Sequence, residues 1–284
     1  MSSRWKAICF GQLGKHTKHL QKSFSPSNVL KISAHDSSGL SLSTLAKVRH
    51  TPQGWVTNTI LSTNYHFKNF CKISASFTSE KQAILNVSTS PEFSKDLLIS
   101  LIAQTRPFSI IPSLAYQNKS FTIASTLDLM ARNVTVSCGT SFGKLAMGSL
   151  IQADAQNMEI IHAVASVELS ITEDLMMNCT LKNKGKAIDF SLWTKLNPNL
   201  TLAFLSSTNL ANYETQLQGE LIGTINEKTE ISTGINSSGL LALSLSRHLS
   251  DNIKISANGV FDVLQPQKIS AHKLGINLFI DSFY

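Results

Sequence analysis

The 284-residue chain has few charges and no long apolar run. Only 15% of its residues are charged, against ~25% in an ordinary soluble domain, although 42% are hydrophobic. The longest nearly continuous apolar stretch, residues 97–103, is broken by Ser100 and falls far short of the ~20 residues that a spanning helix needs. The sequence therefore excludes helical membrane spans, and its hydrophobic content excludes a disordered acidic tail.

Closely spaced cysteines and catalytic motifs are also lacking. The four cysteines, Cys9, Cys71, Cys138 and Cys179, are far apart and form no CxxC pair, which argues against a disulfide scaffold or a zinc site. The eight histidines are scattered, and the chain contains no P-loop, GxSxG, GxGxxG or HExxH motif. The sequence predicts no enzyme, no cofactor and no metal site.

Acidic residues are missing from the first 35 positions, where Asp36 is the first acid. Apolar side chains recur there at intervals of about four residues, with lysines between them, which predicts a basic amphipathic helix over residues 1–25. The apolar positions are Trp5, Cys9, Leu13, Leu20 and Phe24. Two interpretations are open: a mitochondrial transit peptide, or a retained helix that packs its apolar face against the rest of the protein.

From residue 27 onward the hydrophobic period changes to two. Runs of about ten residues, such as 121–129 and 274–281, alternate apolar with polar side chains, which indicates β-strands with one apolar face. Short turns rich in Gly, Asn, Pro or Lys separate the runs. Examples are Asp36–Gly39, Thr51–Gly54, Asn183–Gly185, Asn197–Asn199 and Asn236–Gly239. The pattern predicts a meander of strands without interleaved helices.

The length of these runs favours a membrane barrel over a soluble sandwich. Strands of globular proteins have a mode of ~5–6 residues, whereas a tilted transmembrane strand needs ~9–11. A repeat of about 13–14 residues gives about 19 strands, and so many strands in an open sheet would expose two edges that closure removes. We predict an all-β fold, a transmembrane antiparallel β-barrel over residues 26–284, as one domain after the 1–25 helix.

Three segments resemble the mitochondrial porins, the voltage-dependent anion channels. Phe10-Gly-Gln-Leu-Gly-Lys15 is similar to that family's aromatic-x-x-Leu-Gly-Lys opening. Ile235–Leu243 is similar to its Val-Asn-Asn-Ser-Ser-Leu-Ile-Gly-Leu signature, and His272–Leu278 to its His-Lys-Leu-Gly close. The chain is identified as a divergent member. The resemblance implies the family's nineteen strands, a place in the mitochondrial outer membrane, and a retained helix in the lumen rather than a transit peptide.

The resemblance also implies a function and its residues. The channel would pass small metabolites, nucleotides and inorganic anions under voltage control. Lysines of the helix would narrow the pore, and lysines on polar strand positions would add charge that selects the opposite ion. The predicted pore-lining residues are Lys15, Lys18, Lys22, Lys31, Lys72, Lys182, Lys195 and Lys254. The formal charge of +7 is therefore interpreted as a lining for anions, not as a nucleic-acid surface.

The C-terminal strand also fits a polar-x-Gly-x-x-apolar-x-apolar sorting signal for the barrel-insertion machinery. Its residues are Lys273, Gly275, Leu278 and Ile280. Expected partners are the lipid bilayer, the permeant anions and a second copy of the chain. Two other functions stay open: an outer-membrane protein-import pore, which shares the barrel but needs acidic patches in its lumen, and a poorly conducting barrel used as a lipid-handling or docking scaffold.

Overall fold

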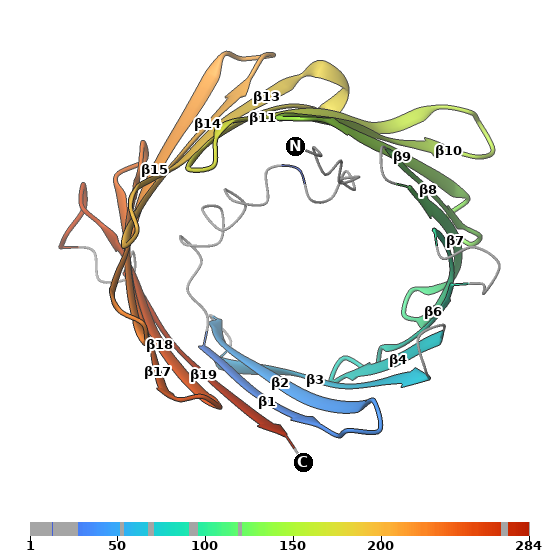
Figure 1. The fold of residues 1–284 in the computed structure, drawn as a ribbon, viewed down its shortest axis with the longest axis horizontal. Helices are drawn as coiled ribbons and strands as arrows, with labels where there is room; N and C mark the ends of the chain where they lie inside the picture. Colours follow the sequence, from blue (N-terminus) through green and yellow to red (C-terminus); the bar gives the residue numbers. More distant parts are fainter. Residues whose placement is uncertain are drawn as a thin grey trace. The chain divides into compact units, whose positions relative to one another are not determined.

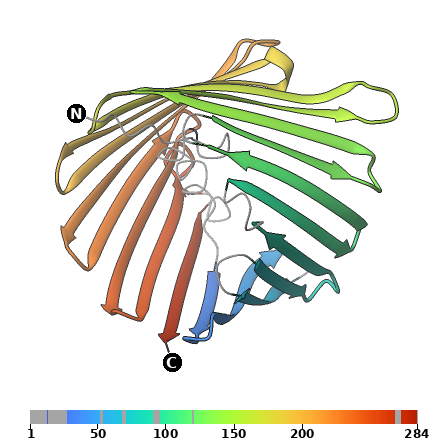
Figure 2. The ribbon, with the colours of Figure 1, turned by 45° about the vertical axis from the view of Figure 1, so that its right-hand side comes forward.

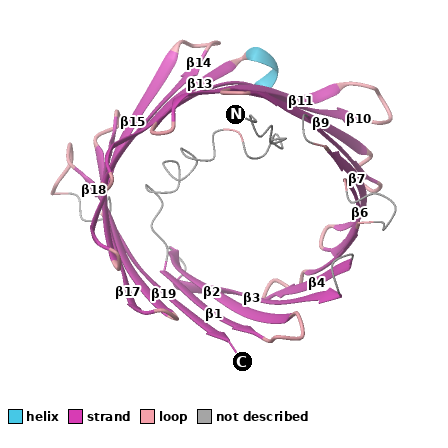
Figure 3. Ribbon diagram, in the orientation of Figure 1, coloured by secondary structure: helices cyan, strands magenta, loops and turns pink. Residues whose placement is uncertain are grey.

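A computed structural model describes residues 28–51, 54–67, 71–90, 96–118, 121–267 and 272–283, together with Leu13. Nearly all of this part of the chain is β-strand (Figure 3). The helix expected over residues 1–25, with Lys15, Lys18 and Lys22, lies outside the described residues, and Leu13 is buried.

Nineteen strands follow one another along the described chain. The first nine are β1 (Asn28–His35), β2 (Leu40–Thr51), β3 (Gly54–Phe67), β4 (Cys71–Thr78), β5 (Ala83–Thr89), β6 (Leu97–Thr105), β7 (Phe108–Gln117), β8 (Phe121–Asp128) and β9 (Asn133–Phe142). The next are β10 (Leu145–Asp154), β11 (Ile160–Thr172), β12 (Leu175–Lys182), β13 (Ala187–Asn197), β14 (Leu200–Asn209), β15 (Glu214–Asn226), β16 (Thr229–Asn236), β17 (Leu240–Ser250), β18 (Ile253–Asp262) and β19 (Lys273–Phe283). A short 3₁₀ turn, η3 (Asn183–Gly185), joins β12 to β13.

All nineteen strands belong to one sheet, which joins β1 to β2 and also to β19, so it closes into a barrel. The predicted all-β barrel of about nineteen strands is confirmed. The prediction of antiparallel pairing fails at one place, because β1 and β19 are parallel. The cause is the odd number of strands: in a meander, the first and the nineteenth strand run in the same direction.

The parallel seam between β1 and β19 has its own side-chain bonds. The amide of Ile276 donates to Oδ1 of Asn28 over 2.9 Å, and Oγ of Ser282 donates to the carbonyl of Ser33 over 3.2 Å. Figure 1 shows β19 and β2 on the two sides of β1. These bonds link the two ends of the described chain.

By its contacts the chain divides into two units. One, the central unit, comprises Asn86–Thr194 and Phe204–Leu217, and it carries the ladder from β6 to β12 and most of β13. The other, the terminal unit, comprises Lys195–Ala203 and the described residues of 28–85 and 218–283, and it carries β1–β4 and β16–β19. In Figure 2 the green and yellow-green strands of the central unit lie side by side.

Asp and Asn side chains shape many of the turns. Oδ1 of Asp154 accepts the amides of Gln156 and Asn157 over 2.7 and 3.2 Å, and Oδ1 of Asn236 accepts the amides of Ser238 and Leu240 over 3.1 and 3.0 Å. A side-chain carbonyl that bonds the backbone two residues on replaces one backbone bond of a tight turn. This chemistry explains why the Asn-rich turns in the sequence marked strand ends.

Candidate functional site: the polar face

Each strand has a polar and an apolar face. The polar side chains are the buried ones and the large apolar side chains are exposed, which is the reverse of a soluble protein. On β11, Ser166 and Glu168 are buried, whereas Val167 and Leu169 are exposed. A soluble protein buries its large apolar side chains and exposes its charges, but a membrane barrel presents apolar side chains to lipid. The buried polar residues are Ser33, Ser109, Thr122, Ser141, Ser166, Glu168, Asn178, Asp189, Ser191, Glu220, Ser246 and Ser256. We call the face that carries them the polar face.

The first four strands contribute only basic charges to the polar face. Lys31 lies opposite Leu45, Lys47 opposite Asn58, and Lys72 opposite His66, all in register with the buried Ser33. Strands β1–β4 contain no Asp or Glu. These four strands therefore add only positive formal charge to the polar face.

The seam adds a further lysine to this basic region. Register places Phe279 of β19 between Lys254 of β18 and Lys31 of β1, in one row across three strands. Near the end of the same seam, Nε2 of His35 lies 3.1 Å from Oδ1 of Asp281, and both side chains are about two-fifths exposed. Two lysines distant in sequence thus occupy the strand positions on either side of Phe279.

In the central unit the polar face is mainly acidic. Strands β6–β12, with β13 as far as Thr194, hold Asp128, Asp154, Glu168 and Asp189 but a single base, Lys182, which leaves a formal charge of −4 + 1 = −3. Register puts all five on the polar face. On these strands the polar face is therefore net acidic.

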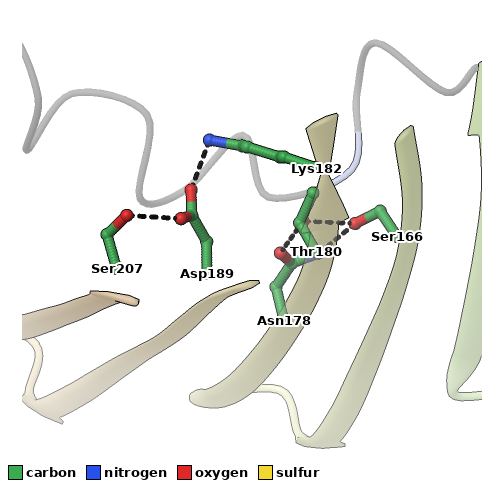
Figure 4. Close-up of polar contacts among 6 residues, drawn as sticks. All are labelled: Ser166, Asn178, Thr180, Lys182, Asp189 and Ser207. Atoms are coloured by element: carbon green, nitrogen blue, oxygen red, sulfur yellow. Dashed lines mark hydrogen bonds and ion pairs between the residues drawn. The ribbon is translucent and has the colours of Figure 1, made fainter. Parts of the chain in front are cut away.

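The single base of this region is itself paired. Nζ of Lys182 donates to Oδ2 of Asp189, and Oγ of Ser207 donates to the other carboxylate oxygen over 2.7 Å (Figure 4). The Lys182 charge therefore has a partner carboxylate, and Asp189 can be buried because its two oxygens are satisfied.

A ring of three polar side chains lies beside this pair. Asn178 donates through Nδ2 to Oγ of Ser166 over 2.9 Å, Thr180 donates to Oδ1 of Asn178 over 2.9 Å, and the Ser166 and Thr180 hydroxyls lie 2.8 Å apart (Figure 4). If Ser166 donates to Thr180, each member donates once and accepts once. Such cyclic networks reinforce one another's bonds and hold the β11–β12 surface in one arrangement.

All the predicted strand lysines that the structure describes lie on the polar face. Register brings Lys31 and Lys254 together across the seam, whereas Lys182 belongs to the central unit. Lys72 and Lys195 are exposed on their strands. Lys47 was not among the predicted pore-lining residues, although it alternates with Ala46 and Val48 in the same way as the selected lysines.

The four sorting-signal residues divide between the faces. Lys273 and Gly275 lie on the polar face, opposite Val260 and Asn258, whereas Leu278 and Ile280 occupy the other parity and lie on the apolar face. Within the described residues, no group of three His, Cys, Asp or Glu side chains could hold a metal ion. In that same part of the chain, we find no helix that is both long and apolar enough to span a membrane.

Comparison with known families gives one match. The family model described as eukaryotic porin matches residues 8–275. None of the curated proteins compared with the chain matches it. The family match covers the basic region, the acidic region and most of the strands described above.

Proposed function

The chain belongs to the eukaryotic porin family, and on this premise we propose that it is a voltage-dependent, anion-preferring channel for small metabolites, nucleotides and inorganic anions. The family forms β-barrel channels of the mitochondrial outer membrane, so the protein is a channel of that membrane and not an enzyme. The choice of permeant rests on the charge of its polar face.

One observation carries the anion preference: strands β1–β4 contribute Lys31 and Lys47 to the polar face and contain no Asp or Glu, and Lys254 extends this surface across the seam. Like charges along a pore lower the energy of the opposite ion and raise that of the same ion. Phosphate groups of nucleotides and carboxylates of metabolites are ions that such a surface favours. Lysine suits this task because its flexible ammonium binds phosphate as a point charge and releases it.

The basic segment of residues 1–25 is proposed to stay in the pore. Lys15, Lys18 and Lys22 would narrow the pore and bias it toward anions. The family match, which begins at residue 8 and so includes these three lysines, supports a retained segment over a cleaved leader. Lys273, Gly275, Leu278 and Ile280 are proposed to be read by the barrel-insertion machinery, and self-association is proposed as a further property.

Planar-bilayer recording tests the anion preference. The double variant Lys31→Glu/Lys254→Glu replaces two positive charges beside Phe279 with two negative ones. We expect its reversal potential in a salt gradient to move toward that of a cation-selective pore. The control is Lys144→Glu, which changes charge in the β9–β10 turn, where Nζ bonds the carbonyl of Ile171 over 2.7 Å. An equal shift in the control, or none in the double variant, would contradict the proposal.

The protein-import pore remains the second candidate, because β6–β12 and β13 up to Thr194 carry four acids on the polar face that could attract a basic presequence. The same recordings separate the two functions. An import pore would prefer cations and be blocked by a presequence peptide, whereas the proposed channel prefers anions. A barrel without conductance would instead be a scaffold.

A further inference from the structure

Four hairpin turns of the central unit form one surface, which we call the turn rim. They are the turns β8–β9 (129–132), β10–β11 (155–159), β12–β13 (183–186) and β14–β15 (210–213). Each follows an even-numbered strand, and consecutive strands run in opposite directions, so all four lie at the same end of this unit's strands. Two backbone bonds tie them in pairs: the Ala155 amide to the Arg132 carbonyl (2.6 Å) and the Leu210 amide to the Lys186 carbonyl (2.8 Å).

The turn rim exposes large apolar side chains where hairpins normally carry small polar ones. Met158 is 83% exposed and Tyr213 is 82% exposed, and Leu129, Met130 and Leu210 are exposed as well. Turn residues are usually Gly, Asn, Asp, Pro or Ser, which cost nothing to leave in water. Exposed apolar side chains gathered at one end of a protein mark an interaction surface.

Backbone conformation strengthens this inference. Met158 and Tyr213 both have a φ of 57°, the left-handed region that costs an ordinary L-residue ~1–2 kcal/mol and that Gly adopts freely. The chain thus places two bulky side chains at positions that would suit glycine. Strain of this kind points to a use for the side chain.

The charge of the turn rim is positive. Its residues include the bases Arg132, Lys184 and Lys186 and one acid, Glu159, a formal charge of +3 − 1 = +2. Arg132 also bonds Oε1 of Gln156 through Nη1 over 2.6 Å, which holds its guanidinium over the neighbouring turn. A partner of this surface should therefore be anionic as well as able to accept apolar side chains.

We propose that the turn rim lies in the headgroup layer of the protein's own bilayer and binds anionic phospholipid. Met158 and Tyr213 insert at the boundary between headgroups and acyl chains, and the two lysines bind lipid phosphates. Amphipathic surfaces with bases beside apolar and aromatic side chains bind membranes in this way. The proposal rests on the membrane location that the family gives, and not on the choice of permeant.

Continuity with the apolar face favours a lipid over a protein. Leu181 and Ile161, beside two of the turns, are exposed on that face, so the apolar surface runs from the strands into the turn rim. Moreover, the inserted side chains stand on separate turns with bases between them. Single side chains can enter between headgroups, whereas a protein interface needs one continuous, well-packed core.

Native mass spectrometry of the full chain with phosphatidylglycerol and phosphatidylcholine tests the proposal. We expect the wild type to bind phosphatidylglycerol more tightly. Lys184→Gln/Lys186→Gln should weaken phosphatidylglycerol binding about 25-fold, from about fivefold per basic side chain, and leave phosphatidylcholine binding unchanged. Met158→Gly/Tyr213→Gly, which relieves the turn strain and therefore keeps the barrel folded, should weaken the binding of both lipids.

Lys144→Gln, at the other end of the central unit's strands, is the matched control and should keep the wild-type preference. Equal binding of the two lipids by the wild type would overturn the proposal, and a turn rim that serves a protein partner would give that result. An unchanged preference in the double lysine variant, or an equal loss in the control, would overturn it as well. Resistance of the folded barrel to denaturant, measured on each variant, shows that its binding is that of a folded protein.

Discussion

The ion pair between Lys182 and Asp189 allows a stability test with a definite magnitude. The Asp189 side chain is 9% exposed and that of Lys182 is 36% exposed. Removing one partner of a fully buried pair costs ~3–5 kcal/mol, since the remaining charge is buried without compensation. Because Lys182 is partly in water and Ser207 still donates to the carboxylate, we expect Lys182→Met to lower the free energy of unfolding by about 2 kcal/mol.

Replacing the acid instead of the lysine should lower the free energy of unfolding by less. Asp189→Asn keeps an oxygen that Ser207 can donate to, and it leaves Lys182 free to turn toward water, so we expect a loss of about 1 kcal/mol. The double variant should be only slightly less stable than Lys182→Met alone, because Asp189→Asn removes the charge that Lys182→Met leaves unpaired. The coupling energy between the two substitutions should therefore be about 1 kcal/mol. Asp189→Asn should also make the channel more anion-selective, since it releases a paired lysine.

Urea unfolding of the protein in lipid vesicles, followed for all four members of the cycle, measures these energies. Lys254→Met serves as the control, because it removes a lysine of the polar face outside this pair and should change stability by no more than ~0.5 kcal/mol. Additive losses of unfolding free energy in the double variant would refute the reasoning. A Lys182→Met protein that unfolds at the same urea concentration as the wild type would refute it as well.

Two further predictions concern turns. Gly39 has a φ of +89°, and a Cβ there would lie 2.7 Å from the carbonyl oxygen of His66, whereas Gly143, with a φ of +59°, has open space around it. In the same unfolding assay, Gly39→Ala should therefore lower the free energy of unfolding by about 2 kcal/mol or more, and Gly143→Ala by about 1 kcal/mol. Equal losses in the two variants would contradict the clash at Gly39. Hydrogen bonds from the Ser38 hydroxyl, then from the Ser38 and Ser37 amides, lower the pKa of Asp36 below its usual 3.8. The stability that they add is complete above pH 3.8 and is lost as the pH falls through the lowered pKa. In an NMR titration Ser38→Ala should move this pKa back toward 3.8, and an unmoved value would show that the hydroxyl has no part in the shift.

The faces of the strands could be predicted from the sequence, because a period of two leaves each side chain only one choice once its neighbours are assigned. Turns such as Asn236–Gly239 were equally predictable from the bonds that Asn makes to its own backbone. The register between strands that are distant in sequence could not be predicted. Only closure of the sheet sets Lys254 and Lys31 on either side of Phe279, and no local pattern contains that pairing.

The contact of Lys182 with Asp189 lies between these cases. Lys182 ends β12, and Asp189 lies on β13 two residues beyond Ala187, which is opposite Lys182. The tight hairpin at Asn183–Gly185 therefore brings both side chains to the polar face. The hairpin was predicted, but a count of lysines does not show that Asp189 neutralises Lys182. A base paired with an acid adds no net charge to the field that attracts an anion.

Net charge is therefore a poor guide to selectivity in this protein, and the position of each charge along the sheet is a better one. The chain's +7 is compatible with a polar face that holds four acids and one base on β6–β12 and β13 up to Thr194, and only bases on β1–β4. Screening limits each charge to about 8 Å at physiological salt, so an anion passing near β1–β4 experiences mainly the charges on and directly beside those strands. The proposed anion preference then belongs to a few strands, and it should respond to Lys31 and Lys254 far more than to an equal number of charges changed elsewhere.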